Sequence, residues 1–204
     1  MFYRPEDGHG LPHDPFTSLV SPRPIGWIST IDAEGGVNLA PYSFFNAICG
    51  KPPMVGFSSE GLKHTAANIV QTGEFVVNMA SGALAQAMNL TSARVPFGVD
   101  EFELAGLEKA PSQTVRPPRV ARAPAALECR LVSITPVVTL DGTQTGNSHI
   151  IGQVTGIHIA PDCLKDGLFD VITAGPIARL GYRDYTQVVS TFSMIRPQDD
   201  LPHP

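Results

Sequence analysis

The segment GFSSEGLKHTAANI places several anion-binding groups at the start of a predicted helix. Ser58 and Ser59 follow an apolar run, and Lys63 and Thr65 open the helix. A helix N-terminus offers unpaired N–H groups and a partial positive charge, which together with hydroxyls and an ammonium can hold a phosphate monoester. The alternative is ordinary capping, in which Ser59 or Thr65 satisfies the N–H groups of the helix itself.

A second polar cluster interrupts the apolar segment APYSFFN. Pro41 cannot donate to a ladder, so its strand is expected at a sheet edge or at a bulge. The backbone from Ser43 to Asn46 would then be free to face a flat polar heterocycle, with Phe44 or Phe45 as an apolar wall. The alternative is a barrel strand whose phenylalanines belong to the core and whose Ser and Asn serve a turn.

A framework of strands must bring these two clusters together. Runs of β-branched, aromatic and alternating apolar residues predict strands over 25–31, from 37 onward, and over 54–57, 75–79, 126–138, 149–159, 168–172 and 186–192. Helices are predicted over 63–71 and 83–90. Because strands and helices do not alternate regularly, a mainly β (α+β) antiparallel barrel with a few peripheral helices is favoured over a parallel sheet.

The length of 204 residues fits one domain over 1–204. Within it, residues 1–17 are expected to form an irregular lead-in. Residues 91–124, rich in Pro, Gly and charge, are expected to make a long, partly helical excursion across the surface. Residues 196–204 form a polar, proline-rich tail that we expect to fray.

Charge and hydropathy exclude several classes of protein. The net charge of −5 argues against a nucleic-acid partner, which needs a basic surface. No run of about 18 apolar residues is present, so no membrane span is predicted, and the N-terminus does not resemble a signal peptide. The three cysteines are far apart and odd in number, which is typical of thiols in a reducing cytosol. We therefore expect a cytoplasmic protein.

Common catalytic and phosphate-binding motifs are missing from the sequence. It contains neither G-x-G-x-x-G nor G-x-x-x-x-G-K-[ST], and no G-x-S-x-G. His149 and His158 are nine residues apart on one predicted strand and should point to opposite faces. His9 and His13 have no suitably spaced Cys or carboxylate, so no metal site is predicted.

Several motifs in order resemble the flavin reductase-like family of FMN-binding split barrels. They are RPIGWIST, then D-x-x-G-x-x-N-x-A-P-Y-S-F-F, then the Lys-His-Thr helix start and GEFVVNM. Two weaker matches follow, HIIGQV and RLGYRDY. The likeness covers residues 18–192, and it implies an antiparallel split β-barrel.

The resemblance implies that FMN binds outside the barrel at the interface of a homodimer. The residues expected to bind FMN are Thr30, Ser43, Phe44, Phe45, Asn46, Ser58, Ser59, Lys63, His64, Thr65 and Arg179. Ser43 to Asn46 would line the isoalloxazine ring, and the Ser58–Thr65 group would hold the phosphate. His64 stands where relatives commonly carry Asp or another polar residue, and Arg179 belongs either to the site or to a surface ion pair.

His149 would approach the exposed face of the ring, where a nicotinamide could stack, and it is the one catalytic candidate. The alternative for His149 is a strand histidine bonded to a backbone group. Hydride transfer itself belongs to the flavin, so the protein needs only to position the rings and place donors at the ring edge.

The function implied is an NAD(P)H-dependent flavin (FMN) reductase, with NAD(P)H as a transient substrate. Such an enzyme can supply reduced flavin to a partner monooxygenase. Three alternatives stay open: a flavoredoxin-like electron carrier, a non-catalytic FMN-binding protein on the same fold, and a barrel for another anionic ligand.

Overall fold

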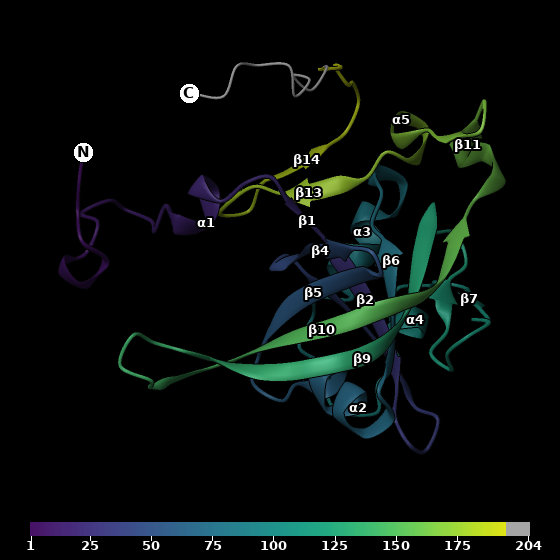
Figure 1. Cartoon of the computed structure of the whole chain (residues 1–204), viewed down its shortest axis with the longest axis horizontal. Helices are drawn as coiled ribbons and strands as arrows, with labels where there is room; N and C mark the ends of the chain where they lie inside the picture. The colour runs from purple at the N-terminus through teal and green to yellow at the C-terminus, as the bar shows by residue number, and fades with distance from the viewer. Residues whose placement is uncertain (195–204) are drawn as a thin grey trace.

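Seven antiparallel strands form the main sheet in the computed structural model, which describes residues 1–194 (Figure 1). Their order across the sheet is β3-β2-β6-β9-β10-β5-β4. The strands are β2 (Gly26–Ile31), β3 (Val37–Tyr42), β4 (Phe45–Gly50), β5 (Pro53–Glu60), β6 (Glu74–Met79), β9 (Ala125–Val138) and β10 (Gln144–Ile159). This confirms the predicted mainly β, antiparallel architecture.

The sheet curls into a barrel that stays open between β3 and β4. These two strands are consecutive in the chain, yet they are the two edges of the sheet, and β3 contacts β5 across the split. Pro41 lies on β3 opposite Trp27 of β2. The edge position predicted from Pro41 is therefore confirmed, because the proline nitrogen takes no place in an inner ladder.

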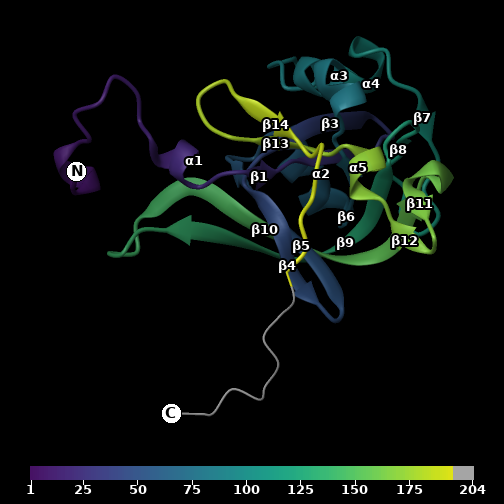
Figure 2. The same ribbon diagram turned by 90° about the horizontal axis from the view of Figure 1, so that it is seen from above.

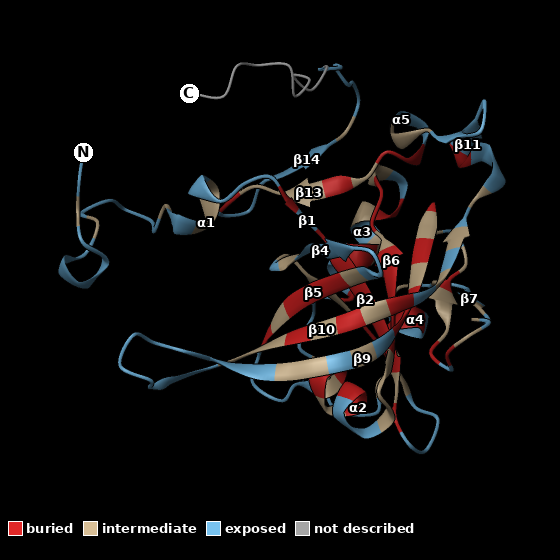
Figure 3. Ribbon diagram, in the orientation of Figure 1, coloured by how far each residue is buried: buried red, intermediate tan, exposed pale blue. Residues whose placement is uncertain are grey.

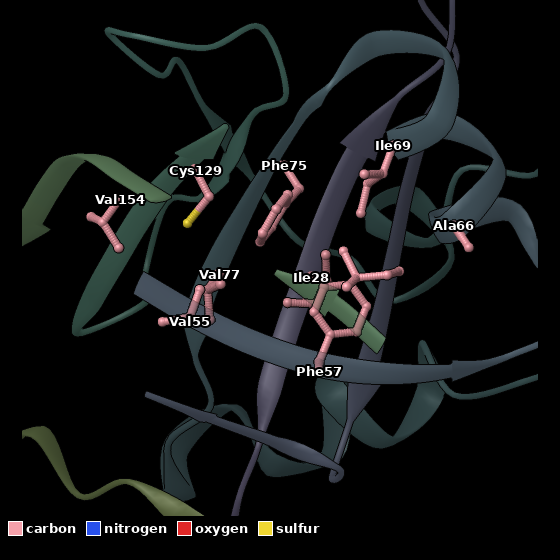
Figure 4. Close-up of a cluster of buried hydrophobic side chains, with 10 residues drawn as sticks. Ile28, Val55, Phe57, Ala66, Ile69, Phe75, Val77, Cys129 and Val154 are labelled. Atoms are coloured by element: carbon pink, nitrogen blue, oxygen red, sulfur yellow. The ribbon is translucent and has the colours of Figure 1, made fainter. Parts of the chain in front are cut away.

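The barrel interior is filled by buried apolar side chains from several strands (Figure 4). On β5, Val55, Gly56, Phe57 and Ser59 are buried, whereas Met54 and Ser58 are only partly buried. The rings of Phe57 and Phe75 meet edge to face with centroids 5.7 Å apart. This contact joins β5 and β6, which are separated by β9 and β10 in the sheet, so the sheet must curl for the two rings to meet.

Helix α2 (His64–Thr72) packs against β2, β3 and β6 and lies below the strands in Figure 1. Ala66 and Ile69 are buried in the same cluster as Phe57 and Phe75. Gly73 ends the helix with φ of 70°, a left-handed conformation that glycine adopts without a steric penalty. The predicted helix over 63–71 is thus confirmed to within one residue at each end.

Strands β9 and β10 form a long hairpin that projects beyond the barrel (Figures 1 and 3). β10 begins at Gln144, five residues before the predicted start, and register shifts interrupt its pairing with β9. The projecting end is exposed, so it lacks the apolar burial from which its length could be predicted.

A small sheet of β1 (Arg23–Pro24), β13 (Ile177–Arg179) and β14 (Tyr185–Gln187) lies beside the barrel (Figure 2). The lead-in includes a 3-10 turn (Pro5–Asp7) and helix α1 (Phe16–Leu19); α1 lies beside this sheet, and the residues before it extend away from the barrel (Figure 2). A Cβ on Gly181 would lie 1.9 Å from Ser18 Oγ, so only glycine permits this close approach of lead-in and turn.

Two buried carboxylates fasten the excursion over 91–124, which contains α4 (Glu101–Leu104), β7 (Lys109–Ala110) and β8 (Arg119–Val120). Glu101 accepts from the Leu39 N–H at 3.0 Å, and burial raises the pKa of its carboxyl. Burial also raises the pKa of Glu128, but hydrogen bonds from Thr114, His158 and the Gln113 N–H outweigh it and bring that pKa to about 2. The excursion is therefore pinned to the barrel by ionic hydrogen bonds.

Several boundary predictions are wrong. The predicted strand over 168–172 holds only β12 (Leu168–Phe169), which pairs with β11 (Leu164–Lys165), and then α5 (Val171–Ala174), because Asp170 caps that helix. The predicted strand over 186–192 shrinks to β14. The helix predicted over 83–90 is a 3-10 turn (Gly82–Leu84) followed by α3 (Ala85–Leu90). Within 1–17, the lead-in carries short helical turns rather than being wholly irregular.

The predicted tail over 196–204 lies outside the described residues. Among residues 1–194, no helix is long and apolar enough to cross a membrane. In that same part of the chain, His, Cys, Asp and Glu side chains form no group of three that could hold a metal ion.

Candidate functional site

The start of α2 keeps its N–H groups available. Lys63 is the N-cap residue, and no side chain of the described residues caps the helix. Ser59 Oγ instead lies 3.4 Å from the Gly61 carbonyl, and Thr65 Oγ1 accepts from Asn38 Nδ2 at 2.9 Å. Neither residue therefore performs the capping role that was the alternative to anion binding.

Lys63 brings a positive charge to this helix start. Its ammonium is exposed and pairs with Glu60 at 2.9 Å. The hydrogen bond from Lys63, and next its charge, lower the pKa of the Glu60 carboxyl. An exposed pair of this kind exchanges readily with other partners, so a phosphate can compete with Glu60 for the ammonium.

Three of the predicted site hydroxyls are buried beneath the helix start. Thr30, Ser59 and Thr65 are each 1% exposed or less. Thr30 Oγ1 accepts from Asn68 Nδ2 at 3.1 Å, and the Oδ1 atom of the same Asn68 is buried without a partner in the described residues. These groups tie α2 to β2 and β3, and the Asn68 Oδ1 is left as a buried acceptor without a partner in residues 1–194.

The segment between β3 and β4 holds the residues predicted to line a flat ring. Ser43 and Phe44 connect the two edge strands, and the Phe44 carbonyl accepts from the Ser58 N–H at 2.9 Å. Phe44 is 53% exposed, whereas Phe45 turns inward and packs on the barrel core. Asn46 is exposed on β4, at the open edge of the sheet. Within residues 1–194 the outer edge of β4 pairs with no strand, so its backbone groups can face a ligand.

His149 lies on the outer face of the barrel next to this edge. It is opposite Ser58 in the ladder, and its Nδ1 is 3.4 Å from Ser58 Oγ. A Cβ on Gly56 would lie 2.8 Å from His149 Nε2, so glycine lets the imidazole rest against the strand. Gly56 in turn pairs with Asn46. The fold thus brings together His149, Ser58 and Asn46, which were predicted from three separate motifs.

His64 and Arg179 are placed differently from the rest. His64 opens α2, and its ring meets Phe97 of the excursion edge to face at 5.1 Å. Arg179 lies on β13, outside the barrel sheet, where it donates to the Tyr185 hydroxyl and the Tyr182 carbonyl. Arg179 shares a cavity with Ser43, which is its link to the proposed ring segment.

Three residues of this region were not predicted from the sequence: Asn38, Asn68 and Arg23. Asn38 and Asn68 hold the buried threonines, and Arg23 stacks 5.8 Å from the Phe44 ring centroid. The available signal was Asn68 on the otherwise apolar side of the predicted helix. A polar residue there must find a buried partner.

Comparisons with known proteins identify the family of the chain. Residues 19–175 match the family described as flavin reductase like domain. An uncharacterized protein of Deinococcus radiodurans is 38% identical over 193 residues, covering 88% of this chain and 82% of the relative. An uncharacterized protein of Halalkalibacterium halodurans is 35% identical over 183 residues, covering 87% of each.

Solved structures show the same fold. Nitrilotriacetate monooxygenase component B from Bacillus cereus has a TM-score of 0.86 at 28% identity, covering 95% of this chain and 98% of that one. The 2-nitrobenzoate 2-nitroreductase of Pseudomonas fluorescens has a TM-score of 0.79 at 29% identity, covering 92% and 91%. The chain belongs to the flavin reductase-like family of split-barrel proteins.

Proposed function

We propose that this chain is an FMN-binding oxidoreductase of the NAD(P)H:flavin reductase type. The observation that carries the proposal is the uncapped start of α2 with Lys63. This helix start follows β5, the strand that pairs with the edge strand β4, which begins in the segment Ser43–Asn46. One ligand with an anionic tail and a flat head fits both features. Family membership supports the same cofactor class.

The phosphate end is assigned to residues around the helix start. Lys63, Ser58 and the N–H groups of the first turn of α2 donate to the phosphate oxygens. Ser59, Thr65 and Thr30 form the buried layer beneath, where hydrogen bonds to Asn38 and Asn68 fix the helix. His64 borders this end, since it begins the helix and contacts the excursion at Phe97.

The ring end is assigned to the edge strand. Bound FMN supplies the N5 atom that accepts a hydride from a nicotinamide. Phe44 offers an exposed apolar face, and backbone N–H groups after Asn46 offer donors for the ring edge. His149, held on the outer face beside Ser58, borders the space where the nicotinamide would lie, and it orients that ring rather than exchanging a proton.

The electron acceptor and the assembly are part of the proposal. The Bacillus cereus neighbour is a monooxygenase component, which supports a partner monooxygenase that receives reduced flavin. A homodimer would cover the exposed edge strand β4, which carries Phe45–Gly50. The three cysteines are free thiols, which supports a reducing cytoplasmic location.

Flavin uptake tests the proposal. Purified chain mixed with FMN should quench the flavin fluorescence and retain the yellow colour through gel filtration. A protein that neither carries nor binds FMN would refute the assignment. Uptake of FMN without any reduction by NADH or NADPH would instead indicate a flavoredoxin-like carrier or an FMN-binding protein without catalysis.

A further inference from the structure

A cleft lies between α3 and the strands β13 and β14. Two adjoining cavities of about 660 Å³ and about 180 Å³ make up this cleft and share four lining residues. The shared residues are Met88, Asn89, Arg179 and Tyr185. The smaller cavity also reaches Ser43, so the cleft opens onto the proposed ring segment. The larger cavity has the size of a site for a small organic ligand.

The lining of the cleft is cationic. Arg179 and Arg183 both line the larger cavity, and none of the described residues lining either cavity is Asp or Glu. The remaining polar groups are uncharged: amides such as Gln86 and Gln187, and hydroxyls such as that of Thr186. Met88 and Ile177 supply apolar wall. Two guanidinium groups without a carboxylate favour an anionic ligand with an apolar body.

A third arginine, Arg23, lies beside the cleft without lining either cavity, and it donates to the Thr17 and Val20 carbonyls. Arg23 of β1 lies directly opposite Arg179 of β13 in the ladder, and like charges in that relation destabilise a sheet. Arg23 is 8% exposed, and its Nε is buried without a partner in residues 1–194. Burial, and next the charge of Arg179, lower the pKa of the Arg23 guanidinium. Within the described chain, neither arginine forms an ion pair.

Neighbouring residues fix the Arg179 side chain at the cleft, whereas the Arg183 side chain is exposed. The Arg179 guanidinium lies 4.5 Å from the Tyr185 ring centroid and donates to that hydroxyl and to the Tyr182 carbonyl. The turn that carries Arg183 is buttressed by the lead-in at Gly181. The Arg183 side chain makes no hydrogen bond or ion pair with residues 1–194, so its donors are available to a ligand. Arginines that line a cleft and form no ion pair within the protein are typical of binding sites rather than of structural networks.

We propose that this cleft binds the anionic group, a carboxylate or a phosphate, of the small organic molecule that reacts at the adjoining flavin site. The link to reaction rests on the proposed function, whereas the anion site itself does not. Arg179 and Arg183 form the anion contact, and Met88 and Ile177 pack on the ligand body. Two sources share this chemistry: an acidic electron acceptor and the phosphate of a nicotinamide dinucleotide.

Calorimetric titration of the full-length chain separates these sources. The probes are benzoate and 2′-AMP, and benzamide and adenosine are their uncharged counterparts. We expect at least one anion to bind about tenfold or more tightly than its uncharged counterpart, the effect of a charge-assisted hydrogen bond. Arg183→Gln should abolish that difference. Arg183 is exposed, so this substitution leaves the fold intact. The matched control is Arg122→Gln, an exposed arginine outside the cleft, which should change nothing.

The titration distinguishes the two possible sources of the anionic group and tests the anion site itself. Preference for benzoate supports an acidic acceptor, and preference for 2′-AMP supports a dinucleotide phosphate. The proposal is overturned if both anions bind no tighter than their uncharged counterparts, or if Arg183→Gln retains the preference. FMN uptake is measured in parallel on the same preparation. Loss of FMN binding alone would refute the proposed function and leave the anion site standing, since the titration needs no flavin.

Discussion

Replacing Lys63 with alanine tests the phosphate end of the proposed site. Lys63 lies at the N-cap of α2, and its ammonium is exposed beside Glu60. The substitution removes one cation without touching the barrel core. FMN and riboflavin differ in the terminal phosphate, so the ammonium should matter for FMN alone.

The size of the effect follows from the exposure of the lysine. A hydrogen bond to a charged group contributes about 1.5–3 kcal/mol, and solvent exposure puts Lys63 at the lower end of that range. The FMN dissociation constant should therefore rise about tenfold. The backbone N–H groups of the helix start remain, so FMN binding is weakened rather than lost. The dissociation constant for riboflavin should change by less than about twofold.

Fluorescence titration at low ionic strength measures both constants. Lys165→Ala, an exposed lysine on β11, is the matched control and should leave both unchanged. Added salt should bring the FMN dissociation constants of wild type and Lys63→Ala closer together, because salt screens exposed charges. Equal losses for FMN and riboflavin would remove Lys63 from a phosphate site and refute the reasoning.

Two further predictions concern the framework that positions the site. The folded pKa of Glu128, about 2, is below its ordinary value of 4.5, so its contribution to stability is complete above pH 4.5 and is lost as pH falls towards 2. Urea unfolding of wild type should therefore lose stability across that window more steeply than Glu128→Gln, and parallel curves would contradict this. Gly152→Ala should lower the unfolding free energy by about 1–3 kcal/mol, because the new Cβ would lie 2.3 Å from Phe75 Cζ in the core. A stability equal to that of wild type would show that the ring has room to move.

The barrel strands could be predicted from the sequence because they are rich in β-branched, aromatic or alternating apolar residues. Residues 75–79 and 126–138 were assigned nearly to their observed ends, since the first is a short, almost continuously buried run and the second alternates between apolar and polar residues in its first half. Helix α2 was also predictable, because it has an apolar face and Gly73 ends it. The contact of Ser58 with the Ser43–Asn46 segment, through the Ser58 N–H and the Phe44 carbonyl, was predictable only from the order of motifs.

Other features depend on contacts between distant parts of the chain. Strand β4 was missed because its residues are mostly exposed and carry no alternating pattern. The pairing of Arg23 with Arg179 joins segments more than 150 residues apart, and no local signal announces it. Glu128 looked like an outward residue on an alternating strand, yet the excursion covers it and supplies its hydrogen bonds.

Anaerobic titration of the FMN-loaded chain with NADH and with NADPH tests the central claim most directly. The proposed function predicts that at least one nucleotide bleaches the visible absorbance of the flavin in a stoichiometric titration. Readmitted oxygen should then restore the absorbance. Bound FMN that keeps its full absorbance with both nucleotides would contradict an NAD(P)H-dependent flavin reductase.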